Sequence, residues 1–314
     1  MFAILRKWLT TIFWPTVTTV ERLEQLLNCK VQDWNTLQSI DLSGRNITSL
    51  PQEVDRWTSA THISLYGNRL TLLPDAVSGW TSATDIDLHN NQLSSLPDTV
   101  SGWTWATHIY LQGNRLTSLP DGVSGWTSAT HIYIGFNLLT SLPDAVSGWS
   151  SAIQIFLFNN QLTSLPDAVS GWTSATHISL RGNQLTSLPD GVSGWSSATD
   201  IYLSSNQLTS LPGAVSGWTS ARHIYLYGNQ ILFVDDNLCG KCWYSYYRDD
   251  LFFSLENKKK ILNRYVCKIQ KIYRRHNEKR NNAAVVIQRA YIDYFYRVRG
   301  PWYNKVYREY LTFN

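Results

Sequence analysis

The chain has 314 residues and a formal net charge of +4, and a chain of this length usually folds as two domains. No stretch approaches the roughly 18–20 consecutive apolar residues that a membrane-spanning helix needs. The charge is uneven, because residues 256–314 hold fifteen Lys and Arg against four Asp and Glu. The remaining twelve Lys and Arg and nineteen Asp and Glu give the rest of the chain a net charge of −7. This change predicts a boundary near residue 250 and a tail with its own partner.

The four cysteines are Cys29, Cys239, Cys242 and Cys267. Cys239 and Cys242 form a single C-x-x-C pair without the four ligands of a structural zinc site, so we expect no metal. Ordinary thiols in a reducing compartment are the favoured interpretation, and a capping disulfide is the alternative. The start of the chain lacks the features of a secretory signal, so we expect a cytoplasmic, intracellular protein. We also expect a monomer.

Residues 1–30 are expected to form a helical N-terminal cap. Four apolar side chains share one helical face there: Phe2, Leu5, Leu9 and Ile12. Such a segment would cover the open end of a repeat array. A membrane-surface anchor is the alternative, although the basic face has only two residues. Thr18 and Glu21 fit a capping box that opens a short helix ending at Leu27.

Close copies of one 23-residue unit, of which Thr176–Ala198 is an example, fill most of the chain. Asn recurs every 23 residues from Asn68 to Asn229, and Trp recurs at the same interval from Trp34 to Trp218. A fixed period of this length predicts a stacked solenoid, in which each repeat buries its apolar face only against its neighbours.

The first half of each unit predicts a strand and a turn. Ile63 and Leu65 alternate with polar residues, which indicates a strand with one buried face. The Asn68 amide is expected to satisfy backbone groups where the chain turns inward, and to form a ladder with its counterparts.

The second half returns the chain to the core. Pro74 ends the inward course because it fixes φ and donates no hydrogen bond. Asp75 is expected to cap a short turn that points Trp80 into the core, and Gly79 to relieve crowding before the indole. Each Trp buries on the order of 150–250 Å², so the column of Trp supplies much of the core.

The pattern A-x-x-I-x-L-x-x-N-x-L-x-x-L-P-x-x-V-x-x-W resembles the leucine-rich repeat family, of the Leu-Pro type. The resemblance covers residues 31–238 as about nine repeats, and it departs from the family in using Trp where Leu is usual. It implies an α/β fold, a leucine-rich repeat solenoid in the form of a curved horseshoe with parallel strands on its concave face. Residues 239–255 would then be a C-terminal cap or connector, followed by an α-helical tail at 256–314.

The strand residues that point away from the core would line the concave face, about 4.8 Å apart from repeat to repeat. Six of the seven histidines and a run of aromatic residues occupy these positions. An exposed aromatic patch is the usual composition of a binding hot spot. The predicted partner-binding residues are His108, Tyr110, His131, Tyr133, Phe136, Phe156, Phe158, Arg181, Tyr202 and Tyr225.

Other interpretations of these positions stay open. Tyr and Phe favour strands and stack across them, so the rings could be inert packing. The histidine column has one adjacent pair, His108 and His131, which is too few for a metal site. The histidines also make pH-sensitive binding a hypothesis, because His titrates near neutrality.

Two runs of the basic tail resemble the IQ motif, a calmodulin-binding helix of the form I-Q-x-x-x-R-G-x-x-x-R. The first run supplies Ile269, Gln270, Arg274 and Lys279. The second supplies Ile287, Gln288 and Arg297. Neither run keeps the Gly of the motif. The resemblance implies calmodulin or a related EF-hand protein as a partner. A structural cap on the last repeat, or a contact with nucleic acid or an anionic membrane, is the alternative.

The sequence predicts a non-catalytic interaction scaffold without a cofactor. It contains no Gly-rich phosphate loop, H-E-x-x-H or G-x-S-x-G pattern, and the residues after the array are too few for a kinase domain. We therefore expect the concave face to bind a protein partner and the tail to recruit calmodulin.

Overall fold

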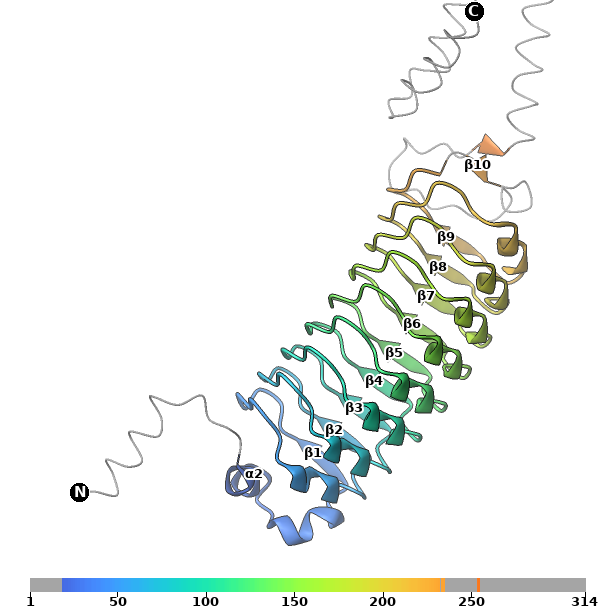
Figure 1. The fold of residues 1–314 in the computed structure, drawn as a ribbon. Helices are drawn as coiled ribbons and strands as arrows, with labels where there is room; N and C mark the ends of the chain where they lie inside the picture. The colour runs from blue at the N-terminus through green and yellow to red at the C-terminus, as the bar shows by residue number, and fades with distance from the viewer. Residues whose placement is uncertain (1–18, 232, 235–252, 255–314) are drawn as a thin grey trace, which may run out of the picture. The chain divides into compact units, whose positions relative to one another are not determined.

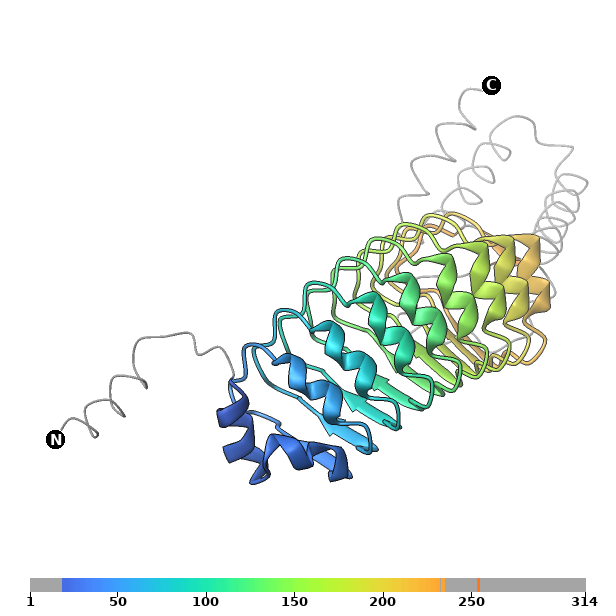
Figure 2. The same cartoon turned by 60° about the horizontal axis from the view of Figure 1, so that its bottom comes forward.

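The computed structural model describes residues 19–231, 233–234 and 253–254. The chain divides into two compact units, and the first holds all described residues up to Gln230. In this unit, parallel strands run side by side along one face, and short helical turns repeat along the opposite face (Figure 1). Figure 2 shows the helical turns aligned in a row in front of the strands.

The described part of the first unit begins with the α-helix α2 (Val20–Leu27). Its strands are β1 (Ser39–Asp41), β2 (His62–Ser64), β3 (Asp85–Asp87), β4 (His108–Tyr110), β5 (His131–Tyr133), β6 (Gln154–Phe156), β7 (His177–Ser179), β8 (Asp200–Tyr202) and β9 (His223–Tyr225). Its 3-10 helices are η1 (Val31–Thr36), η2 (Gln52–Arg56), η3 (Asp75–Gly79), η4 (Asp98–Gly102), η5 (Asp121–Gly125), η6 (Asp144–Gly148), η7 (Asp167–Gly171), η8 (Asp190–Gly194) and η9 (Gly213–Gly217). In the second unit, β10 (Phe233–Val234) pairs in parallel with β11 (Phe253–Ser254).

The strands β1 to β9 form one parallel sheet in sequence order. Each strand pairs with the next at an offset of one repeat, so that Ile40 lies opposite Ile63 and Ile63 lies opposite Ile86. Every one of these repeats therefore contributes one strand and one short turn. This arrangement confirms the predicted α/β solenoid with parallel strands along one face.

Buried Asn side chains connect successive repeats. Asn68 Oδ1 accepts hydrogen bonds from the backbone N–H groups of Arg45 and Ile47, at 3.0 and 2.9 Å. Its Nδ2 donates to the carbonyls of Leu42 and Leu65, both at 2.8 Å. Later Asn residues of the column, as far as Asn229, make the same kinds of contact with their own repeat and with the preceding one. The Asn ladder is confirmed, and it satisfies backbone groups that would otherwise be buried without partners.

A column of buried indoles runs beside the helical turns. From Trp57 to Trp218, neighbouring rings lie 5.7–6.0 Å apart and nearly parallel. From Trp80 onward, each indole Nε1 donates to a Val carbonyl of the preceding repeat, as in the 3.2 Å bond to Val54. Parallel strands are only about 4.8 Å apart. The indoles are therefore spaced somewhat more widely than paired strands, and they link each repeat to its neighbours by stacking and by hydrogen bonds.

The first repeat departs from this regularity. The Trp34 and Trp57 rings are tilted by 52°, and among the described residues Trp57 Nε1 has no hydrogen-bond partner. The helix α2 adjoins this repeat, because the Arg22 guanidinium donates to the Arg45 carbonyl at 2.9 Å. Its Leu23 side chain is fully buried. The helix α2 therefore packs against the first repeat, and the cap as a whole stays a prediction.

Three local expectations were wrong. Thr19, and not Thr18, is the N-cap of α2, since its Oγ1 accepts from Arg22 N at 3.3 Å. Asp75 does not cap η3, because a backbone bond from Val77 N to the Pro74 carbonyl closes that turn. Gly79 does not make room for the indole. A Cβ at this position would lie 2.2 Å from the Asp55 carbonyl oxygen of the neighbouring turn.

Several predictions concern residues outside the described ranges. These are the segment 1–18, the boundaries near 238 and 255, and the tail 256–314 with its IQ-like residues. Within the described ranges, no helix has both the length and the apolar character to cross a bilayer.

Candidate binding surface on the strands

Three columns of side chains point outward from the sheet, and we call them together the strand face. The first column holds Ser39, His62, Asp85, His108, His131, Gln154, His177, Asp200 and His223. The second holds Asp41, Ser64, Asp87, Tyr110, Tyr133, Phe156, Ser179, Tyr202 and Tyr225. The third holds Ser43, Tyr66, His89, Gln112, Gly135, Phe158, Arg181, Ser204 and Tyr227. The strand register places successive members of the first two columns side by side.

Five predicted residues, which we call the central aromatic cluster, contact one another in a chain of rings: Tyr110, Tyr133, Phe156, Phe158 and Phe136. Successive ring centroids along this chain are 5.2, 5.0, 6.3 and 5.1 Å apart. Aromatic pairs favour such offset and edge-to-face distances. The structure therefore brings together the aromatic residues that the sequence placed in neighbouring repeats.

Two backbone features give these rings their positions. Phe136 has a φ of 53°, in the left-handed region where the equivalent residues include Gly67, Asn90 and Gly113. Its side chain is nevertheless 57% exposed. At Gly135, a Cβ would lie 2.9 Å from the Phe158 ring, so the missing side chain makes room for that ring.

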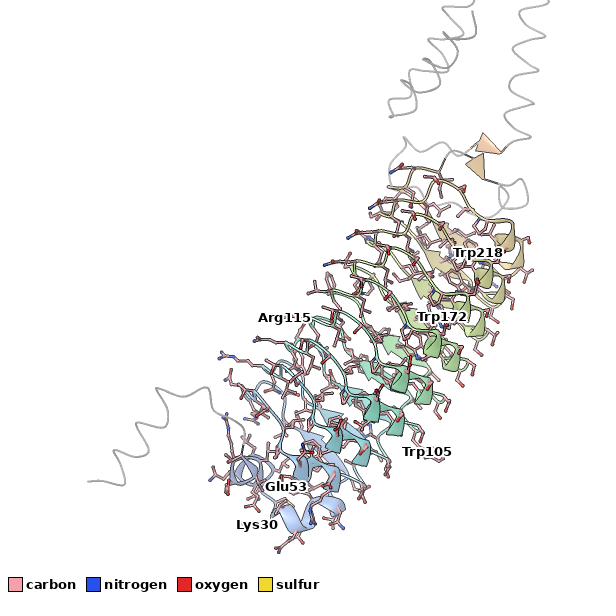
Figure 3. All side chains as sticks on the ribbon, in the orientation of Figure 1. Lys30, Glu53, Trp105, Arg115, Trp172 and Trp218 are labelled. Carbon is pink, nitrogen blue, oxygen red and sulfur yellow. The ribbon has the colours of Figure 1, made fainter. Side chains whose placement is uncertain are left out.

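Three more exposed apolar side chains belong to the same repeats: Trp105, Leu138 and Ile153. Figure 3 shows Trp105 projecting from the edge of the array. Sequence reasoning missed all three, although a signal was present. Each replaces a polar residue that occupies the same position in the neighbouring repeats, Ser for Trp105, Arg or Gln for Leu138 and Thr for Ile153.

The predicted histidine pair lies beside this cluster. The rings of His108 and His131 are stacked with centroids 4.5 Å apart. His108 Nδ1 also lies 3.3 Å from Asp85 Oδ1, and His62 Nε2 lies 3.4 Å from the other oxygen of that carboxylate. Burial and the neighbouring His108 lower the pKa of His131 from its usual value.

Asp200 is held in a similar way, between His223 at 2.8 Å and His177 at 3.5 Å. Burial raises the pKa of Asp200, but hydrogen bonds from Thr199 and His223 outweigh it, and the net shift is downward. In the part of the chain that the structure describes, no three His, Cys, Asp or Glu residues are grouped so that they could hold a metal ion.

A second aromatic group lies further along the array. The rings of Tyr202 and Tyr225 are stacked 4.6 Å apart, and the Arg181 guanidinium lies 6.0 Å from the Tyr227 ring centroid. In the second column, Ser179 separates this group from the central aromatic cluster. The predicted residues therefore form two groups on one face, and burial raises the pKa of Tyr110, Tyr133 and Tyr202 within them.

Comparison with known proteins agrees with this architecture. Residues 173–231 match the leucine rich repeat family. A leucine-rich repeat protein of Leptospira interrogans has a similar fold, with a TM-score of 0.59 and 25% identity over 63% of this chain and 50% of that one. No curated protein matches the sequence.

Two further solved structures are also similar in fold. The PEPR1–AtPEP1 structure has a TM-score of 0.52 and 21% identity over 67% of this chain and 34% of that one. The structure of a TDR receptor has a TM-score of 0.54 and 18% identity over 74% of this chain and 46% of that one. The chain spans half or less of each of these three proteins. The Leu-Pro subclass stays a prediction. The family match and the shared fold identify the repeat array as a leucine-rich repeat solenoid.

Proposed function

We propose that this protein is a non-catalytic, intracellular scaffold whose strand face binds a protein partner through the central aromatic cluster. Repeat solenoids present extended surfaces of this kind for interaction. Aromatic side chains are enriched at the centres of protein interfaces, where they contribute most of the binding energy.

The conformation of Phe136 carries this proposal. An L-residue in the left-handed region costs roughly 1–2 kcal/mol, and Phe136 recovers little of this through burial because most of its side chain is exposed. Strained residues of this kind cluster at functional sites. Inert packing across strands explains a Tyr or a Phe in the second column, but it does not explain a strained, exposed ring in the loop beside it.

Proximity labelling with the full-length protein tests this function. We expect the partners labelled by the wild type to be lost in a Tyr133→Ala/Phe156→Ala variant, because both rings lie within the cluster. Labelling should be kept in a Leu72→Ala/Trp105→Ala variant, the matched control, since these exposed apolar side chains lie outside the three columns of the strand face. Circular dichroism should show that both variants are folded. Unchanged labelling by the Tyr133→Ala/Phe156→Ala variant would mean that the rings are inert packing.

We further propose that the basic tail recruits calmodulin or a related EF-hand protein through Ile269–Gln270 and Ile287–Gln288. The support is the resemblance to the IQ motif and the excess of Lys and Arg in residues 256–314. Full-length protein should bind immobilised calmodulin, and an Ile269→Ala/Ile287→Ala variant should not. Absence of binding both with and without calcium would remove this function. Retention on nucleic acid or anionic vesicles that falls steeply with salt would favour the alternative partners.

A further inference from the structure

Arg181 differs electrostatically from every other charged residue of the strand face. The carboxylates of this face have partners, since Asp85 and Asp200 each lie between two histidines and Asp87 pairs with His89. Asp41 accepts a hydrogen bond from the backbone N–H of Ser43 at 3.0 Å. Arg181 is the one Arg or Lys of the three columns. Among the described residues it forms no ion pair within 4.0 Å.

Ser204 lies next to Arg181 in the third column and has an unused hydroxyl group. The residue is 1% exposed, and its Oγ has no hydrogen-bond partner in the described part of the chain. Arg181 and Tyr227 lie on either side of it in the column, with the guanidinium 6.0 Å from the Tyr227 ring centroid. Its Oγ has less than 1 Å² of accessible surface, so the hydrogen-bond donors that a ligand can reach at this point are those of the exposed Arg181 guanidinium.

The neighbouring column is also interrupted at this point. Ser179 is a small residue between Phe156 and Tyr202, and it belongs to the same repeat as Arg181. The aromatic surface therefore stops beside the guanidinium and resumes one repeat later. The Arg181 guanidinium, which can only donate hydrogen bonds, therefore lies between the two aromatic groups.

We propose that Arg181 binds the carboxylate of an acidic side chain of the partner, an inference that rests on the proposed function. A guanidinium can donate two parallel hydrogen bonds to a carboxylate. The carboxylate only accepts hydrogen bonds, and it supplies the counter-charge that the face lacks at Arg181. The Tyr227 ring holds the guanidinium near Ser204, which reduces the ordering cost of binding.

The geometry also fixes where this acidic residue lies in the partner. The Arg181 guanidinium lies 6.0 Å from the ring of Tyr227, which is three repeats beyond Phe158, so it is about two repeats, or about 10 Å, from Phe158 along the sheet. An extended segment rises about 3.3 Å per residue. The acidic residue should therefore lie about three positions from the apolar residue that contacts the central aromatic cluster.

Selection of displayed random 12-residue peptides on the full-length protein tests the proposal. We expect wild type to enrich peptides with Asp or Glu about three positions from an aromatic or aliphatic residue. Selection on Arg181→Glu should instead enrich Lys or Arg at that position. A wild-type-selected peptide should bind Arg181→Gln roughly tenfold more weakly when measured by fluorescence anisotropy.

Controls separate this proposal from the proposed function. Arg115→Glu makes the same charge change at the loop edge of the array (Figure 3), and it should leave binding of the selected peptide unchanged. Peptides that require Tyr133 and Phe156 but bind Arg181→Gln as well as wild type would overturn the acidic subsite and leave the proposed function intact. Enrichment that persists in Tyr133→Ala/Phe156→Ala, or no enrichment on wild type, would count against both.

Discussion

Phe136, in the loop beside the strand face, adopts a strained conformation that keeps its ring exposed. The equivalent positions that have positive φ are Gly, Asn or Ser in the other described repeats. These residues tolerate the left-handed conformation, because Gly lacks a Cβ and short polar side chains can bond locally. A bulky aromatic residue has neither property. The turn alone would favour Gly, Asn or Ser, so the Phe at this position indicates a role for its exposed ring beside Phe158.

Replacing Phe136 with Asn should separate stability from binding. We expect Phe136→Asn to leave the free energy of unfolding unchanged or to raise it by up to about 1 kcal/mol, since relief of the strained φ exceeds or equals the lost ring contact with Phe158. Partner labelling should fall. Asn159→Phe, the reverse change at an equivalent position with a φ of 53°, should lower stability. Urea unfolding measures both, and a loss of more than about 1 kcal/mol in Phe136→Asn would show that the ring is a packing residue.

His131 should make the array sensitive to mild acid. Its pKa is lowered from 6.5 by burial and by His108, so the unfolded chain binds a proton more readily than the folded one. Stability then falls as pH decreases through about 6.5 and below. Asp41 and Asp200 do not contribute in this window, because their pKa values are lowered from 3.8. Urea midpoints at pH 7.5, 6.5 and 5.5 should show a shallower decline for His131→Gln than for wild type.

A matched substitution makes this pH prediction specific. His177 belongs to the same column but lies 3.5 Å from a carboxylate of Asp200, in contrast to His131. His177→Gln should therefore keep the part of the acid-induced decline that His131 causes. Equal slopes for wild type and His131→Gln would show that protonation of His131 is not coupled to folding.

Among the structural elements, the 3-10 turns pack closest to one another. A Cβ at Gly125 of η5 would lie 2.2 Å from the Ser101 carbonyl oxygen of η4, whereas a Cβ at Gly213 of η9 would meet nothing within 4 Å. We expect Gly125→Ala to lower the free energy of unfolding by roughly 1–3 kcal/mol, as overpacking does. Gly213→Ala should be neutral or slightly stabilising. Comparable urea midpoints for the two variants would contradict the close packing of these turns.

The elements also show what the sequence could and could not predict. The strands, the Asn ladder and the Trp column follow from the spacing of Ile63, Asn68 and Trp80, because each recurs in register and must face its own copy. The turn caps do not follow from spacing. A backbone bond to the Pro74 carbonyl makes a side-chain cap at Asp75 unnecessary, and no residue pattern distinguishes these two solutions.

The candidate site was predictable to a similar degree. Periodicity places Tyr110, Tyr133 and Phe156 in one column, so their contact could be predicted. The φ of Phe136, the space beside Gly135 and the unpaired Ser204 hydroxyl depend on dihedral angles and side-chain directions. These are set by packing between repeats, and a repeat pattern does not contain them.

At the scale of the whole array, stability accumulates through contacts between neighbouring repeats. The interfaces in the middle of the array are nearly equivalent, since each indole stacks on the next and donates to the preceding repeat. The interface at the N-terminal end is weaker in both respects. Its rings are tilted, and Trp57 Nε1 has no partner among the described residues. Unfolding should therefore begin at this end more readily than in the middle.

Two identical substitutions test this difference between the end and the middle of the array. Trp57→Phe and Trp126→Phe remove the same atoms from fully buried sites. Only Trp126 loses a hydrogen bond, the 3.1 Å contact from its Nε1 to the Val100 carbonyl. The Trp126→Phe variant should therefore be less stable than Trp57→Phe by about 0.5–1.5 kcal/mol in urea unfolding, the net contribution of one hydrogen bond, because the Val100 carbonyl still accepts from the backbone N–H of Trp103. If Trp57→Phe costs as much as Trp126→Phe, the first interface is as strong as the others, and fraying from this end is wrong.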